Sequence, residues 1–554
     1  MSTDFVLALH THLPYVLNHG RWPHGSDWIT EAAVDTYLPM IEALQALEAE
    51  GTPTPVTIGL TPVLANQLAH PTFAAELDLF LAQRLEACEA ASADGDGRIA
   101  DAARFWGQRY ARLARVFASI DRDIIGAFRV LAERGRVELM TSAATHGFLP
   151  LLGRDESIRL QLAVGRLEFR RLIGTDAAGI WLPECGYRPR GIWRPFPEMR
   201  DDRERVGIEE HVHAAGFSFF FADAHMARAG APLGMHAEPT GGWPERVATS
   251  WSPGDPTRTP YRAYRVSQHE HPVHALIRDP RSSAQVWSRH GGYPGDGAYL
   301  EFHKTRWPGG LKLWRVSAPG TDLGSKEPYE AGAAFGRAVA HGRHFASLLA
   351  EVGEREAHRH PSGDVIVAPF DTELFGHWWF EGPEFLTSVW RSLREQPSVR
   401  AVTASRHLAD RAGHAGVRLA PGSWGKDGDW SMWIGPETAW MWPPIWRLEE
   451  AFWAEARPAL ANETARPILA QAARSMLLAQ SSDWPFIVST GEVADYAIKR
   501  FRGHVEDTEG LLQGIRHGLA TGEWEGVQRF AEELRVRDDL FPTILEAIEA
   551  ALHG

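Results

Sequence analysis

Short apolar runs that end in polar or ring-bearing side chains recur along the first two thirds of this chain of 554 residues. Many residues of these runs are β-branched or aromatic, and the stretches between them, such as 31–50 and 121–134, have helical composition. Strands that alternate with helices form parallel sheets, and functional side chains at the carboxyl ends of such strands are typical of a β/α barrel. The sequence therefore predicts an α/β fold of TIM-barrel type, with strands at 5–9, 56–60, 137–140, 179–182, 217–221 and 365–368.

Three departures from this alternation divide the chain. Residues 72–135 are amphipathic and rich in Ala, Glu and Arg, which predicts a helical domain inserted into the barrel. Residues 228–262 contain many Gly and Pro residues without periodicity, and a connection of this length is usually functional, so we expect an active-site lid loop. Apolar residues at helical spacing from Glu437 onwards predict a catalytic barrel at 1–410 and a helical domain at 411–554 that contributes Trp and Asp side chains to the substrate groove.

Charge and cysteine content argue against several classes of function. The formal net charge is −14, from 57 basic and 71 acidic residues without a basic tract, which argues against a nucleic-acid partner. The apolar run at 5–9 is too short for a signal peptide or a membrane span, so we expect a cytoplasmic protein with no membrane partner. Cys88 and Cys185 provide neither a disulfide framework nor the spacing of a metal site.

Two segments each end a strand-like run by presenting a carboxylic acid. Residues 180–189, Ile-Trp-Leu-Pro-Glu-Cys-Gly-Tyr-Arg-Pro, present Glu184, and residues 365–374, Val-Ile-Val-Ala-Pro-Phe-Asp-Thr-Glu-Leu, present Asp371. Two such acids suit cleavage of a glycosidic bond, because one attacks or stabilises the anomeric carbon and the other protonates the departing oxygen. The alternative is that both acids are structural, paired with Arg or capping a helix. The aromatic residues near them in the sequence are Trp181, Tyr187, Phe370, Phe375, Trp378 and Trp379.

His10-Thr-His12 ends the first predicted strand and has two interpretations. Alternate residues of a strand share a face, so the pair could begin a zinc site of the kind that metal-dependent amidohydrolases use. No second compact His/Asp pair follows, and we therefore favour contacts to sugar hydroxyls or positioning of a nucleophile, with no metal. The further ligands that a metal site would need could come from His146, His225, Asp223 or Asp371.

The chain has 22 Trp and only 10 Tyr residues, and many of the Trp residues stand beside Gly, Pro, Asp or Arg in loop-like contexts. Sugar rings stack on indole through their C–H faces, so a groove lined by Trp side chains is the interpretation we favour. Packing between the barrel and the helical domain is the alternative, above all for Trp446 and Trp440. Asp483, in Ser-Ser-Asp-Trp-Pro, either reaches the active site from the helical domain or caps a helix. Six Trp residues crowd one stretch: Trp424, Trp430, Trp433, Trp440, Trp442 and Trp446.

Five motifs follow one another along nearly the whole chain: His-Thr-His-Leu-Pro-Tyr at 10–15, Gly-Leu-Thr-Pro-Val at 59–63, Trp-Leu-Pro-Glu-Cys-Gly-Tyr at 181–187, Pro-Phe-Asp-Thr-Glu-Leu-Phe-Gly-His at 369–377 and Ser-Ser-Asp-Trp-Pro-Phe at 481–486. Together they resemble the five sequence regions of glycoside hydrolase family 57. The segments around Glu184 and Asp371 look like those of the 1,4-α-glucan branching enzymes of that family. This resemblance implies a distorted (β/α)7 barrel with an inserted helical domain and a helical C-terminal domain, and it implies no metal and no cofactor.

The resemblance also implies roles for individual residues. Glu184 matches the nucleophile of the family and Asp371 its general acid/base. The remaining matches are expected to bind the sugar, His12 and His146 in the first subsites, and we expect the same of His10 and Trp378 beside them. The positions that match the lining of the glucan site are Arg278, Trp287, Gly295, Trp424, Trp433 and Asp483.

The expected activity is cleavage of an α-1,4-glucan with retention, through a covalent glucosyl-enzyme, and transfer of the chain to a 6-hydroxyl to make an α-1,6 branch. Alternatives that use the same acids are an amylase-like hydrolase and a 4-α-glucanotransferase. A non-catalytic glucan-binding protein and an amidohydrolase are more remote. Branching members of the family carry a Tyr at the tip of the lid, but this chain has none between Phe221 and Tyr261, so either His236, Trp243 or Trp251 substitutes at the tip or the lid works differently. This departure bears on the ratio of transfer to hydrolysis. The sequence specifies neither the length of chain transferred nor the oligomeric state.

Overall fold

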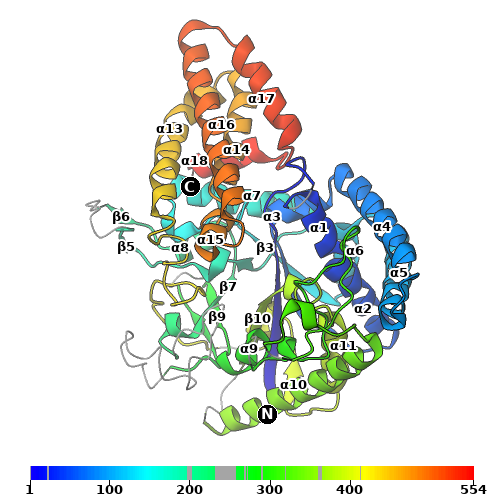
Figure 1. The fold of residues 1–554 in the computed structure, drawn as a ribbon. Helices are drawn as coiled ribbons and strands as arrows, with labels where there is room; N and C mark the ends of the chain where they lie inside the picture. Colours follow the sequence, from blue (N-terminus) through cyan, green and yellow to red (C-terminus); the bar gives the residue numbers. More distant parts are fainter. Residues whose placement is uncertain are drawn as a thin grey trace.

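The structure is a computed structural model, and it describes residues 2–21, 24–195, 203–230, 258–267, 270, 272–288, 291–318, 320–359, 365–411 and 413–553. Figure 1 shows a lower body of strands surrounded by helices and a group of long helices that rises from one end of it. The N-terminus lies in the lower body, and the C-terminal helices form the upper part.

Five strands form a continuous parallel sheet in the order β10-β1-β2-β3-β4. Every residue of β1 (Thr3–Thr11), which lies between β10 and β2, is buried. A strand that is covered on both faces reads as an unbroken apolar run, and this is why the sequence predicts β1, β2 and β10 well. The other four strands are β2 (Val56–Leu60), β3 (Val137–Ser142), β4 (Ile180–Trp181) and β10 (Val365–Asp371).

Two further parallel strands close the sheet into a barrel. β7 (Phe219–Ala222) pairs with β9 (His274–Ile277), and single bridges join Gly179 to Phe219 and Arg278 to Val367. The described residues therefore form a ring of seven parallel strands. Between β4 and β7, and between β9 and β10, the strands are joined by a single bridge, so the ring is a distorted barrel, as predicted. Sequence analysis did not identify β9, which is only four residues long. Shorter strands decorate this frame: β5 (Gly191–Ile192), β6 (Glu204–Arg205), β8 (Ala263–Arg265) and β11 (Val399–Ala401).

Helices between the strands cover the barrel, and α7 (Asp155–Ile173) illustrates why they form. Asp155 and Glu156 lie in its first turn and Arg170 and Arg171 in its last, so both ends have charges that complement the helix dipole. Gly174, at a φ of 88°, ends the helix because glycine adopts this left-handed conformation without steric cost. The other barrel helices are α2 (Leu38–Ala49), α3 (Pro62–Leu68), α6 (Ile124–Glu133), α8 (Ile208–Ala214), α9 (Pro280–Trp287), α10 (Ala331–Arg359), α11 (Gly382–Leu393) and α12 (Ala404–Asp410).

Residues 72–135 are helical, as the sequence predicts. α4 (Pro71–Ala91) packs along α5 (Gly97–Ser119), and the pair lies on the flank of the barrel next to α1 (Ser26–Ala32) and α2 (Figure 1). α6 packs against β3 and α7 and so serves as a barrel helix. A separate inserted domain with these boundaries stays a prediction.

The C-terminal helices pack around α14 (Ala465–Ala479), which is buried on nearly all sides. A helix that is apolar all round needs neighbours on every face, and α13, α16, α17 and α18 supply them. α15 points from this group toward the barrel, and α18 packs on α7 (Figure 1). The bounds are α13 (Trp442–Leu460), α15 (Asp483–Thr490), α16 (Ala494–Thr521), α17 (Glu525–Arg537) and α18 (Ile544–His553).

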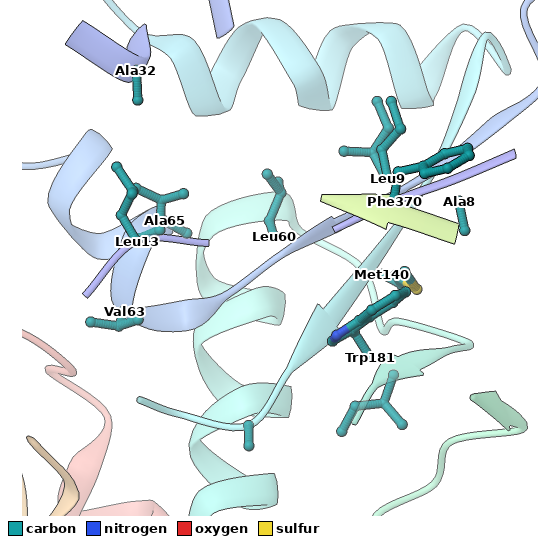
Figure 2. Close-up of a cluster of buried hydrophobic side chains, with 14 of the residues drawn as sticks. Ala8, Leu9, Leu13, Ala32, Leu60, Val63, Ala65, Met140, Trp181 and Phe370 are labelled. Atoms are coloured by element: carbon teal, nitrogen blue, oxygen red, sulfur yellow. The ribbon is translucent and has the colours of Figure 1, made fainter. Parts of the chain in front are cut away.

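The barrel core extends to the strand ends. Figure 2 shows side chains from five neighbouring strands that meet in one cluster, among them Leu9, Leu60, Met140, Trp181 and Phe370. All five are buried. Trp181 ends β4 and stacks on His10 at 4.6 Å, so apolar packing directly supports the first polar side chains of the barrel mouth.

The predicted lid, 228–262, lies mostly outside the described residues, as do His236, Trp243 and Trp251. No helix in the described ranges has both the length and the apolar character needed to cross a membrane.

Candidate active site

The carboxyl ends of the barrel strands bring both predicted acids and the three predicted histidines to one mouth. His10 lies near the end of β1, His12 follows that strand, and Asp371 is the last residue of β10. Glu184 follows β4, and His146 follows β3.

The backbone of Glu184 is held in a left-handed conformation. Glu184 and Cys185 have φ values of 60° and 49° within the short turn Pro183–Cys185. Such backbone costs roughly 1–3 kcal/mol for each non-glycine residue and persists only where its surroundings fix it. The carbonyl of Glu184 accepts a hydrogen bond from the backbone N–H of Trp424 at 3.0 Å. The turn therefore aims the carboxylate at a fixed point of the mouth.

Each carboxylate oxygen of Glu184 accepts one hydrogen bond from the part of the chain beyond the barrel strands. The indole N–H of Trp424 donates to Oε2 at 2.9 Å, and the hydroxyl of Ser482 donates to Oε1 at 3.0 Å. Burial raises the pKa of Glu184 to about 7, although these two donors favour the ionised form and oppose the rise. Glu184 is thus poised to change its charge near neutral pH.

Asp371 is partly exposed at the end of β10, and no described residue donates a hydrogen bond to its carboxyl group. Burial raises the pKa of Asp371 well above its ordinary value, and the neighbouring charges of Glu373 and Glu184 add to the rise. The positive charge of Arg278 opposes it. Asp371 therefore keeps its proton to a higher pH than an ordinary aspartate does.

The three histidines form a stack beside Glu184. The rings of His10 and His146 are 4.8 Å apart, and those of His12 and His146 are 4.0 Å apart. Nε2 of His10 faces Nε2 of His146 at 2.9 Å, and burial lowers the pKa of both side chains well below the ordinary value. Two neutral imidazoles can share one proton in such a contact, so the pair needs no cation between the rings.

Asp483 reaches the barrel mouth from the first turn of α15. Its carboxylate contacts Nε2 of His12 at 3.0 Å, while Nδ1 of His12 meets the hydroxyl of Thr61 at 3.1 Å. Burial is the largest single influence on the pKa of His12 and lowers it, but the charge and hydrogen bond of Asp483, together with the charges of Glu184 and Glu373, make the net shift upward. Both ring nitrogens of His12 thus contact protein groups, and Asp483 lies beside the sugar-binding positions that the family motifs imply.

Arg278 and Trp287 both lie near the ring of Trp424, which bonds Glu184. Arg278 follows β9 and pairs with the buried Asp223 at 3.4 Å, and its guanidinium lies 5.7 Å from the ring of Trp424. The ring of Trp287 lies 6.2 Å from Phe370 and 6.3 Å from Trp424. An aromatic wall with one cation therefore borders the acids.

Gly295, Trp378 and Trp433 have no hydrogen bond or ring contact with either acid within the described ranges. Trp433 is fully buried and stacks on Phe148 at 4.5 Å. Trp378 is 42% exposed beside His377. Gly295 ends the short turn that begins at Tyr293, whose ring packs near Trp379. Their sugar contacts remain predictions. Trp446 bonds the carbonyl of Leu151 and packs on Trp193 and Trp442, in agreement with packing between the barrel and the helices.

One His/Asp cluster in the described ranges has the compactness of a metal site: His504, Asp507 and Asp538. Asp538 already bonds His19 at 2.6 Å and Arg537 at 2.6 Å, and Arg537 also bonds Asp507. Protein cations thus take up the charge of these carboxylates, which makes the cluster an ion-pair network between α16 and α17.

Comparison with known proteins identifies the family. A family model described as glycosyl hydrolase family 57 matches residues 6–418. The chain belongs to glycosyl hydrolase family 57. A second model, described as the C-terminal part of 1,4-alpha-glucan branching enzymes, matches residues 448–548. The resemblance predicted from five short motifs is therefore confirmed over nearly the whole chain.

Relatives match along nearly the full length. A 1,4-alpha-glucan branching enzyme of Thermococcus kodakarensis is 36% identical over 549 residues, 98% of this chain and 78% of that protein. A probable 1,4-alpha-glucan branching enzyme of Mycobacterium tuberculosis is 32% identical, over 97% of this chain and 96% of that protein. The crystal structure of the Thermococcus enzyme superimposes with a TM-score of 0.91 at 35% identity, covering 99% of this chain and 96% of the other. The α-amylase AmyC of Thermotoga maritima gives 0.79 at 26% identity, covering 98% and 99%.

Two polar residues of this family 57 site escaped the sequence analysis. Glu373 is buried and accepts hydrogen bonds from the hydroxyl of Tyr37 at 2.6 Å and the backbone N–H of His12 at 3.2 Å, and burial raises its pKa to about 7. Ser482 bonds Glu184. Glu373 stands two positions after Asp371 and Ser482 directly before Asp483, so proximity to a predicted residue was the available signal.

Proposed function

We propose that this family 57 protein is a 1,4-α-glucan branching enzyme. The main support for the proposal is that the regions matched by the two family models contact each other at the carboxylate of Glu184. Glu184 lies in the region matched by the family model, and Ser482, which donates to it, lies in the region matched by the branching-enzyme model. Relatives named as branching enzymes cover 97–98% of the chain, including both regions.

In the proposed reaction Glu184 attacks the anomeric carbon of an α-1,4 bond while Asp371 protonates the departing glycosidic oxygen. The product is a glucosyl ester on Glu184, and the non-reducing fragment stays covalently bound. Asp371, now ionised, then takes the proton of an incoming 6-hydroxyl, whose oxygen displaces Glu184 and forms an α-1,6 bond. Two displacements retain the anomeric configuration, which requires the carboxyl groups to be about 5–5.5 Å apart.

The pKa values of the two acids support these roles. Burial raises both, but Glu184 titrates near 7, whereas the pKa of Asp371 is raised well above the ordinary value for an aspartate. A raised pKa lets Asp371 keep a proton where an ordinary aspartate has lost it, as an acid catalyst requires, and the two donors to Glu184 favour the ionised form that a nucleophile requires. We further propose that the predicted sugar-binding side chains hold the glucan: His10, His12, His146, Arg278, Trp287, Gly295, Trp378, Trp424, Trp433 and Asp483. The substrate is then an α-glucan such as amylose or glycogen. The protein acts in glycogen biosynthesis, and it is located in the cytoplasm.

A second candidate function is α-1,4-glucan hydrolysis. It is favoured by the likeness to an α-amylase at 26% identity over nearly the whole of both chains. It is also favoured by the lack of a Tyr between Phe221 and Tyr261, because exclusion of water from the glucosyl-enzyme decides between the two acceptors. The cleavage step is the same in both functions.

The test follows amylose incubated with the purified protein and scores new α-1,6 linkages by proton NMR together with new reducing ends. A branching enzyme produces more α-1,6 linkages than reducing ends, and a hydrolase produces reducing ends alone. Glu184→Gln and Asp371→Asn abolish both signals. Either variant retaining full activity would refute the proposed roles.

Glu381→Gln is the matched control for these variants. Glu381 is also a buried acid with a pKa raised by burial, to about 8, but its partners are Tyr329 and the backbone of Leu300 rather than residues of the barrel mouth. We expect this variant to keep the wild-type ratio of branching to hydrolysis.

A further inference from the structure

A continuous line of hydrogen bonds runs from the barrel wall to Glu184. Nε2 of His10 meets Nε2 of His146 at 2.9 Å, Nδ1 of His146 meets Oγ of Ser482 at 2.8 Å, and Oγ of Ser482 meets Oε1 of Glu184 at 3.0 Å. All four side chains are at most 9% exposed as residues. Ser482 is attached to His146 twice, because its backbone N–H also donates to the carbonyl of His146 at 3.0 Å.

The two possible directions of this line correspond to two charge states of Glu184. When Glu184 is ionised, the one hydroxyl proton of Ser482 points to Oε1, so Oγ must accept from Nδ1–H of His146. A neutral His146 then accepts at Nε2 from Nε2–H of His10, and Nδ1 of His10 is left without a proton. When Glu184 instead carries a proton on Oε1 and donates it to Ser482, every bond reverses, and Nδ1 of His10 must carry an N–H.

The closed end of the line favours the first direction. Nδ1 of His10 is buried and has no hydrogen-bond partner in the described structure, and it lies near Gly59, where even a Cβ atom would be only 3.6 Å from it. Buried N–H groups without an acceptor are rare in native structures, rarer than buried acceptors without a donor. The imidazole of His10 is also fixed by two contacts, because its face stacks on Trp181 at 4.6 Å and its Nε2 bonds His146.

We propose that Ser482 is a positioning residue for Glu184. The hydrogen bonds of the line His10–His146–Ser482 have one favoured direction, in which the hydroxyl of Ser482 donates a hydrogen bond to the ionised carboxylate. This inference rests on the proposed function, in which Glu184 attacks as a carboxylate. Trp424 can only donate to the other oxygen, so both oxygens are oriented, and the ionised form is stabilised against burial. The serine that orients the nucleophile thus lies after α14, 298 positions along the chain from Glu184.

The test compares pH profiles of the initial rate at low amylose concentration for wild type, Ser482→Ala, Ser482→Thr and Ser489→Ala. Ser489 is the matched control, because it lies on α15, the helix that begins directly after Ser482, and its hydroxyl donates to the backbone carbonyl of Met432. We expect Ser482→Ala to shift the acid limb, the rise of the rate on the acidic side of the pH profile, upward by about one pH unit. At pH values below the limb the rate falls roughly tenfold, and at pH values above it the rate recovers nearly in full. Ser482→Thr restores the limb, and Ser489→Ala leaves it in place.

An acid limb that Ser482→Ala does not move, or a loss of rate that is equal at every pH, overturns the inference. Melting temperatures of the two alanine variants exclude unfolding as the cause. If the wild type releases reducing ends but forms no branches, the proposed function fails while the limb still reports on Ser482. If it shows no turnover, the carboxyl band of Glu184 is titrated by infrared difference between wild type and Glu184→Gln. The midpoint must again rise in Ser482→Ala, and an unchanged midpoint overturns the inference.

Discussion

A buried acid outside the active site, Glu381, is predicted to make the stability of the protein depend on pH. Its Oε1 accepts from the hydroxyl of Tyr329 at 2.7 Å and the N–H of Leu300 at 3.1 Å, while no described residue donates to Oε2. Burial raises the pKa of Glu381 from 4.5 to about 8 despite these donors. Between these two values the folded state binds more protons than the unfolded state, so the free energy of unfolding falls as pH rises.

Replacing Glu381 by Gln removes this dependence while keeping the shape of the side chain. From pH 6 to the folded pKa of about 8 the interval is about 2 pH units, and each unit corresponds to about 1.4 kcal/mol. Wild type should therefore lose roughly 3 kcal/mol more than the variant between pH 6 and pH 9, measured by urea denaturation. Other buried acids titrate alike in both proteins and cancel in the difference. Equal losses in wild type and variant would refute the reasoning.

Two predictions concern the pH profile of the proposed active site. Trp424→Phe keeps an aromatic ring but removes the indole N–H that donates to Oε2 of Glu184. The acid limb of amylose turnover should therefore shift upward by about 1–2 pH units. Its control is Trp453→Phe, which loses a bond from α13 to Ser157 on α7, and equal acid limbs in the two variants would contradict the argument. Glu373→Gln removes a negative charge that raises the pKa of Asp371, so the alkaline limb should fall by roughly one unit. An alkaline limb that stays or rises would contradict that prediction.

The fold could largely be predicted because its strands are buried on both faces. β1, β2 and β10 read as unbroken apolar runs, and polar residues mark where they end. β9 gave no such signal, because four residues between irregular segments do not show a period. Arg278, at its end, could be named only through the family motifs.

The site could be predicted only in part. Glu184 and Asp371 each stand at the end of a run, and this local pattern is sufficient to find them. The donors that orient Glu184 lie 240 and 298 positions away, and no local pattern reports that Trp424 and Ser482 converge on the two oxygens of one carboxylate. Burial of Trp433 beneath the mouth likewise depends on its stacking with Phe148 across the barrel boundary.

The central claim is that Glu184 becomes glucosylated, and mass spectrometry of a trapped enzyme tests it most directly. Asp371→Asn is incubated with α-maltosyl fluoride, whose leaving group needs no acid, so the first step proceeds while the second lacks its base. We predict a maltosyl group on the peptide that contains Glu184, and none when Glu184→Gln is added to the same protein. A maltosyl group on another residue, such as Glu373, would contradict the account.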